Sequence, residues 1–175
     1  MAGSLHQMTM TYVAEQDRLM FRVSTTDDIE YQMWFTRRFV GVLWGALRQT
    51  MERNPDLRDD MTRDVKDAIL GMEHQEAVQQ ADFTQEHKKD NTNLTSNTGP
   101  LLVVGGAVTP GEGELTGIKF STKDGTEVRF NLNKQLLHAF CHLMVSTAVR
   151  AEWSLDLTMG DANVVLPDAA VQQVH

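Results

Sequence analysis

The chain has 175 residues, of which 41% are hydrophobic and 23% are charged, and its formal net charge is -8. A chain of this length buries enough apolar surface to fold without a disulfide or a metal. Its single cysteine excludes an internal disulfide and favours a reducing compartment. The acidic balance argues against general binding of nucleic-acid backbones, because that binding requires an excess of positive charge.

The sequence shows neither the apolar run of a membrane-spanning helix nor the features of a signal peptide. No apolar run approaches the length of about 20 residues that a membrane-spanning helix needs. Residues 1–16 lack the basic start and apolar core of a signal peptide. We therefore expect a cytoplasmic protein that does not contact membranes.

The first third of the chain predicts three strands followed by a helix. Alternating apolar and polar residues predict strands at residues 8–13, 19–23 and 29–35. Thr36 is a typical helix N-cap, and apolar residues recur at helical spacing after it. Asn54-Pro55 would end this helix, because a residue before proline avoids helical angles.

The middle of the chain is more polar and more acidic. A sparse apolar stripe predicts a long helix from about residue 56 to residue 82. Residues 88–98 are polar and rich in turn-forming residues, which predicts a flexible loop.

The last part of the chain returns to strands and ends in another helix. Strands are predicted in the ranges 101–104, 115–122 and 127–132, with a hairpin turn at Lys123-Asp124-Gly125 between the last two. Asn133 would cap an amphipathic helix. Alternation then predicts a short final strand at 153–157, followed by a mobile C-terminal tail at 158–175.

The two ends of the chain resemble each other. When Val23 is aligned with Phe120, the caps Thr36 and Asn133 coincide and the apolar positions of strand and helix match. We therefore predict an α+β fold of two antiparallel sheet-plus-helix (βββα-like) units related by a pseudo-twofold. The single domain would span 1–157, with half-units 4–54 and 99–152 joined by a helical connector at 55–90. True duplication stays open, because any hairpin followed by an amphipathic helix aligns in this way.

The nearest approach to a metal pattern is a pair of histidines. His138 and His142 are four residues apart and would share one helix face, as zinc-binding pairs do. A third ligand would have to come from Glu73, His74 or Glu76 on the acidic helix. A helical histidine more commonly hydrogen-bonds a neighbour, so no metal is predicted.

Other chemical motifs are weak. Cys141 lies in the middle of a predicted helix beside apolar residues, which indicates a buried, inert thiol. Gly105-Gly106 and Gly111-Glu112-Gly113 lack the spacing of phosphate-binding loops and indicate a bulge and a loop. There is no G-x-S-x-G motif. We predict no catalytic residue and no cofactor, and favour a protein that is not an enzyme.

The cluster Trp34-Phe35-Thr36-Arg37-Arg38 is the feature that packing explains least. Its two arginines follow the cap and would occupy the first helical turn, where cations are mildly unfavourable. Lys134 takes the matching place in the second half. The cluster indicates an anion or partner contact. Alternatively, the arginines form ion pairs with acidic side chains of the chain itself, for example those of the long helix.

Two stretches resemble a family of uncharacterised bacterial proteins. Residues 18–44 (RLMFRVSTTDDIEYQMWFTRRFVGVLW) are similar to that family's opening hairpin, which is followed by Thr-Arg-Arg. Residues 136–157 (LLHAFCHLMVSTAVRAEWSLDL) are similar to its closing helix and A-E-W turn. The resemblance covers residues 8–157 and implies no activity.

A looser likeness concerns architecture alone. Paired sheet-plus-helix units resemble the Whirly and PUR-type proteins, which bind single-stranded nucleic acid through basic and aromatic surfaces. The strand faces expected to be exposed here are mixed in character: Thr9, Thr11, Arg22, Glu30, Gln32, Trp34, Glu127, Arg129 and Asn131.

The sequence therefore favours a non-enzymatic binding or assembly module that acts through protein–protein contacts, either with an unknown protein or by self-association as a homodimer. An exposed Trp34 beside Arg37 and Arg38 would form the contact surface. The alternative is a single-stranded nucleic-acid-binding protein that uses Arg22, Arg37, Arg38 and Arg129.

Overall fold

The computed structural model describes residues 5–53, 62–80, 93–94 and 99–157. Two antiparallel meanders form the sheet, and their strands are β1 (Leu5–Val13), β2 (Arg18–Thr25), β3 (Ile29–Thr36), β5 (Leu101–Pro110), β6 (Thr116–Thr122) and β7 (Glu127–Leu132). The meanders join where β3 and β5 pair in parallel, so the strand order is β1-β2-β3-β5-β6-β7.

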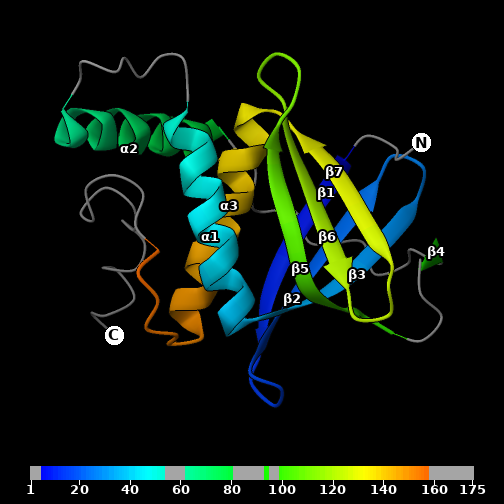
Figure 1. Cartoon of the computed structure of the whole chain (residues 1–175). Coiled ribbons are helices and arrows are strands. Elements are labelled where there is room, and N and C mark those ends of the chain that lie inside the picture. Colours follow the sequence, from blue (N-terminus) through cyan, green and yellow to red (C-terminus); the bar gives the residue numbers. More distant parts are fainter. Residues whose placement is uncertain (1–4, 54–61, 81–92, 95–98, 158–175) are drawn as a thin grey trace.

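A helix follows each meander directly. Helices α1 (Arg37–Glu52) and α3 (Lys134–Arg150) start where β3 and β7 end. Thr36 and Asn133 are their N-caps, as predicted: the Thr36 hydroxyl accepts from the Phe39 N–H at 3.2 Å, and the Asn133 carboxamide accepts from the Leu136 N–H at 2.8 Å. The two helices run in opposite directions beside each other (Figure 1).

Helix α2 (Arg63–Gln80) connects the halves in sequence and lies across one end of the helix pair. In Figure 1 it crosses near the last turn of α1 and the first turn of α3. The long helix was predicted for residues 56–82, and residues 54–61 and 81–92 lie outside the described part of the chain, as does the predicted tail at 158–175. No helix in the described ranges is both long and apolar enough to cross a membrane.

Aromatic side chains from both halves meet in one core between the sheet and the helices. Phe21 and Phe35 from the first meander lie with ring centroids 5.4 Å apart, and Phe120 from the second lies 5.2 Å from Phe35. Phe140 of α3 stacks edge-on against Phe21 at 5.2 Å. The α+β class is thus confirmed. The half-unit boundaries and the pseudo-twofold relation stay predictions.

The predicted final strand at 153–157 is wrong. These residues are irregular and pair with no described strand, although the Trp153 ring lies 6.2 Å from that of Tyr12 on the edge strand β1. The Trp153 N–H instead donates to the Ala148 carbonyl at 3.2 Å and ends the helix, and Trp153 and Leu157 are buried against the core. The alternation of apolar and polar residues at 153–157 arises because the apolar side chains of this irregular segment pack inward and the polar ones face solvent.

The loop predicted at 88–98 contains one paired segment, the two-residue strand β4 (Asn93–Leu94). It pairs in parallel with β3 at Ile29 and Glu30. The rest of the predicted loop up to residue 98 lies outside the described residues.

Strand β5 continues well beyond its predicted end at Val104. A bulge between Val103 and Gly105 shifts its register with β6, as the glycine pair indicated. A Cβ on Gly106 would meet the Lys119 carbonyl oxygen, so the backbones approach too closely for any other residue.

Candidate protein-binding surface

The predicted cluster around Arg37 and Arg38 lies where β3 leads into α1. Both arginines are exposed in the first turn of the helix. Trp34 is only partly exposed, because it sits within the sheet between Met20 of β2 and Leu102 of β5. Trp34 is therefore less exposed than predicted, whereas Arg37 and Arg38 are both exposed.

Two carboxylates of α2 pair with other cations. Lys134 Nζ lies 3.0 Å from Glu73, and the Arg48 guanidinium lies 3.3 Å from Asp67. Within the described part of the chain, neither Arg37 nor Arg38 forms an ion pair. The prediction that the long helix neutralises these arginines has no support among these contacts.

A groove runs beside these arginines between α1 and β5. Its walls are formed by one face of α1 and the segment 102–108 of β5, and the lining residues from α1 and its cap are Thr36, Arg38, Phe39, Val42, Leu43 and Ala46. Two of the lining side chains, Val42 and Val104, are 68% and 61% exposed. In Figure 1, α1 and β5 rise side by side.

Arg22, a predicted binding residue, serves the fold instead. Its Nε and Nη2 donate to the Glu30 carboxylate at 3.1 and 2.8 Å, and the Gln32 amide donates to the same oxygen at 2.6 Å. Glu30 is only 1% exposed, so its predicted exposure is wrong. A buried carboxylate needs such donors, and this need fixes Arg22 against the sheet.

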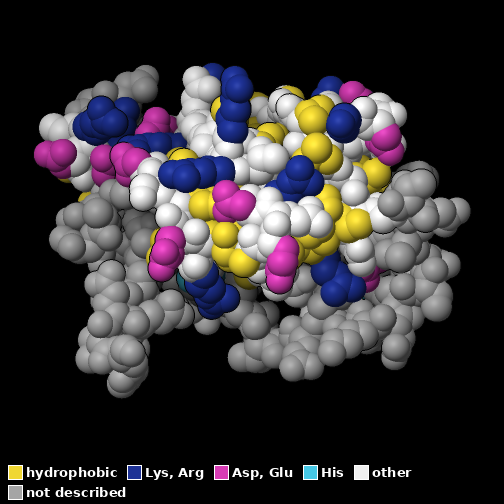
Figure 2. All heavy atoms as spheres, turned by 90° about the horizontal axis from the view of Figure 1, so that it is seen from below, with side chains coloured by type: hydrophobic (Ala, Val, Ile, Leu, Met, Phe, Trp, Pro, Cys, Tyr) yellow, Lys and Arg dark blue, Asp and Glu magenta, His cyan; other side chains and the backbone are white. Residues whose placement is uncertain are grey.

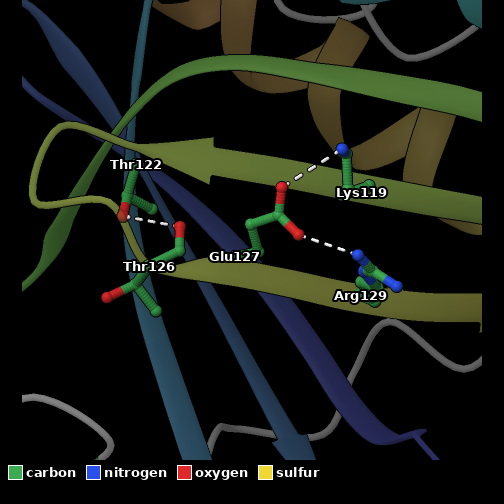
Figure 3. A network of polar contacts seen from close by, with 5 residues as sticks. All are labelled: Lys119, Thr122, Thr126, Glu127 and Arg129. Carbon is green, nitrogen blue, oxygen red and sulfur yellow. Dashed lines mark hydrogen bonds and ion pairs between the residues drawn. The ribbon is translucent and has the colours of Figure 1, made fainter.

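Arg129 lies apart from the α1 arginines, because β5 and β6 separate its strand β7 from β3. Figure 3 shows Glu127 held between Lys119 and Arg129, at 3.2 and 2.8 Å. The hydrogen bond from Arg129 and then that from Lys119 lower the pKa of Glu127. The structure therefore does not bring Arg129 and Arg22 together with Arg37 and Arg38 as one surface.

The residues considered as metal ligands include two histidines that contact each other through a hydrogen bond. His74 of α2, one of the three proposed additional ligands, lies with its Nδ1 3.1 Å from Nδ1 of His138. Burial lowers the pKa of both imidazoles to about 4, so one neutral ring donates to the other. The His142 ring lies 6.2 Å from that of His74.

Metal and thiol chemistry receive no structural support. In the described ranges, no three His, Cys, Asp or Glu side chains are arranged to hold a metal ion. Cys141 is buried, and its burial raises the pKa of the thiol to about 12. That position matches the inert thiol predicted from the helix pattern.

Sequence reasoning missed a contact that ties the first hairpin to the end of α3. Asp17, in the turn after β1, accepts hydrogen bonds from the Tyr12 hydroxyl at 3.0 Å and the Trp153 indole at 2.7 Å. Those two bonds, from Trp153 first, lower the pKa of Asp17, and the positive charge of Arg37 lowers it further. The positive φ of Asp17 marks the turn, but no local signal indicates its distant tryptophan partner.

The outer faces of the strands do not form a basic, aromatic surface. The phenylalanines of the sheet point into the core, and alternation along β3 leaves Trp34 on the opposite face from Met33 and Phe35. Figure 2 shows the molecule from below, and on that side the Lys and Arg side chains are dispersed, with Asp and Glu among them. Comparisons with family models, curated proteins and solved structures give no match for this chain.

Proposed function

We propose that this chain is a non-enzymatic binding module that contacts another protein through the first turn of α1 and the adjoining groove. The supporting observation is that Arg37 and Arg38 are exposed and form no ion pair within the described part of an otherwise acidic chain. Arginine beside apolar side chains is the composition of interface hot spots. The exposed Val42 supplies such an apolar neighbour.

Arg37 and Arg38 lie where positive charge destabilises their own helix, α1. A cation near a helix N-terminus is unfavourable by about 0.3–1 kcal/mol, because the free N–H groups there carry partial positive charge. The chain has 24 Asp and Glu residues, yet none in the described part pairs with these two. An acidic partner would supply the missing counter-charge.

A protein partner is favoured over single-stranded nucleic acid. Arg22 and Arg129, which a nucleic-acid surface would need, are engaged by Glu30 and Glu127. Stacking of bases requires aromatic rings on the open face of the strands, and the rings of Phe21, Phe35 and Phe120 lie in the core instead.

Charge reversal tests the proposal. The tagged wild-type chain, the double variant Arg37→Glu/Arg38→Glu and the control Arg129→Glu are each used to capture proteins from an extract of the native cell, with quantitative mass spectrometry. We expect one set of proteins to bind the wild type and the control and to be lost with the double variant. Equal capture by all three chains would contradict the proposal.

Two further measurements distinguish the alternatives. Salt-dependent binding of a single-stranded oligonucleotide that the double variant loses would support the nucleic-acid alternative instead. Light scattering over a range of concentrations tests the predicted homodimer, and a dimer that the double variant converts to monomer would make the partner a second copy of this chain.

A further inference from the structure

We infer that the groove between α1 and β5 binds an extended, acidic segment of the partner, which adds as a strand to the unpaired edge of β5. This inference rests on the proposed function and specifies the chemistry of the partner. It follows from three features of the groove: an open strand edge, vacant space beside small residues, and arginines at one end that form no ion pair with the described residues.

The open edge arises from the way in which β3 ends. β3 pairs with β5 only at Leu101 and Leu102, and the chain then turns into α1 after Thr36. The rest of β5, residues 103–110, pairs with β6 on its other side, and no described strand pairs with it on this side. The backbone N–H and C=O groups of an unpaired edge are a template for another strand.

The residues along this edge leave room for side chains of another molecule. A Cβ built on Gly105 would meet no atom within 4 Å, and Ala107 adds only a methyl group. On the opposite wall, Val42 and Ala46 of α1 face the same groove, and Val104 stands exposed at 61%. Small apolar side chains of an extended segment match this lining.

The charge of the groove selects an acidic occupant. Arg38 lines it, Arg37 lies beside it, and none of its described lining residues is Asp or Glu. Trp34 pairs with Leu102, which places the arginines near the beginning of the open edge. A carboxylate at that end of the bound segment would satisfy the arginines while its apolar residues lie farther along.

A helix would use this groove poorly. A helix satisfies its backbone groups internally, so it gains nothing from the free edge of β5. An extended segment gains main-chain hydrogen bonds from the edge and specificity from the alternate side chains that enter the groove.

Short labelled peptides test the inference by fluorescence anisotropy. The probe alternates valine and threonine and ends in two glutamates. One comparison peptide replaces the glutamates with lysines, and another carries N-methyl groups on alternate backbone amides, which remove the donors that a strand needs. We expect each change to weaken binding about tenfold or more, because it removes a charge-assisted contact or the main-chain pairing.

Variants of the protein locate the site. Arg38→Glu and Val104→Glu should each weaken probe binding about tenfold. Val65→Glu, at an exposed valine of α2 outside the groove, is the matched control and should bind like the wild type. Thermal unfolding of each variant establishes that it is folded. We expect Val104→Glu and Val65→Glu to fold, because both valines are exposed.

The outcomes separate this inference from the proposed function. Strand addition would be overturned if the probe did not bind, if the N-methylated probe bound equally well, or if Val104→Glu had no effect. In that case the proposed function would still stand, provided that protein capture depended on Arg37 and Arg38. A chain that is dimeric in light scattering and becomes monomeric with Val104→Glu would overturn the acidic partner in favour of a second copy. Capture unaffected by reversal of both arginines would overturn the proposed function itself.

Discussion

Helices α1 and α3 begin in the same way but in different surroundings. Each has a polar cap followed directly by a cation, Arg37 in one and Lys134 in the other. Lys134 lies 3.0 Å from Glu73 of α2, whereas Arg37 and Arg38 have no ion-pair partner in the described chain. Because α2 crosses the start of α3 and not that of α1, one cation supports the fold and the others remain available (Figure 1).

Where α2 packs on the start of α3, His74 of α2 and His138 of α3 form a buried pair. We expect the largest loss of stability in this set of predictions when acid protonates this pair. Both pKa values fall from 6.5 to about 4, so the folded chain holds the rings neutral while the unfolded chain protonates. Stability is therefore complete above pH 6.5 and decreases as the pH falls toward 4. The expected loss is about 3 kcal/mol per histidine, measured by urea unfolding across this pH range.

Replacement of both histidines separates this effect from ordinary acid denaturation. His74→Leu/His138→Leu should remove most of the pH dependence between pH 6.5 and 4.5. Asp17, Asp124 and Glu127 have lowered pKa values, so their contribution is lost only as the pH falls below about 4.5. A double variant whose stability falls as steeply as that of the wild type above this pH would contradict the assignment.

The sequence predicts local structure well and long-range partners poorly. Thr36 and Asn133 are recognisable as caps because capping depends on neighbouring residues. Which of Arg22, Arg37, Arg38 and Arg129 form internal ion pairs could not be predicted, because this depends on carboxylates that the fold brings close. His74 was one of three proposed neighbours of His138, and only the docking of α2 selects it.

The open edge of β5 shows the same limit. Periodicity predicts a strand after Gly99-Pro100 and indicates a bulge at the glycine pair. It does not predict that β5 pairs in parallel with β3 for only two residues, because this depends on where α1 leaves the sheet. The groove that results is a property of topology, and residue patterns alone do not reveal it.

Removal of Arg22 should have the next largest effect, since this cation has an internal role that Arg37 and Arg38 lack. Arg22→Ala would remove the two hydrogen bonds that this guanidinium donates to the buried Glu30 and should lower the free energy of unfolding by about 3 kcal/mol. Arg129→Ala is the matched control: its side chain is 72% exposed, and its removal should change stability by less than about 0.5 kcal/mol. Chemical denaturation of both variants measures the difference.

A second substitution tests the cause. In Arg22→Ala/Glu30→Gln the buried charge is gone, so part of the lost stability should return. If Arg22→Ala were no more destabilising than Arg129→Ala, Arg22 would belong with the available cations and the distinction between internal and available cations would fail.

Lys134 should have a smaller effect, because its ion pair with Glu73 is partly exposed. A double-mutant cycle with Lys134→Ala and Glu73→Ala should give a coupling energy of about 0.5 kcal/mol. Lys134 also lowers the pKa of His138, although less than burial does, so Lys134→Ala should raise that pKa slightly in an NMR titration. A coupling energy of zero would make the starts of α1 and α3 energetically alike.

The smallest expected change is the one that bears most directly on function. Arg37→Ala and Arg38→Ala should leave thermal stability unchanged or raise it by about 0.3 kcal/mol each, because they remove cations from a helix N-terminus. Arg48→Ala on the same helix is the control: Arg48 pairs with Glu52 at 2.9 Å and with Asp67 at 3.3 Å, and its loss should cost about 0.5–1 kcal/mol. Destabilisation by Arg37→Ala or Arg38→Ala equal to that of Arg48→Ala would reveal an internal role for these arginines. Neutral or stabilising substitutions would mean that the two cations contribute nothing to the fold, as the proposed contact with an acidic partner requires.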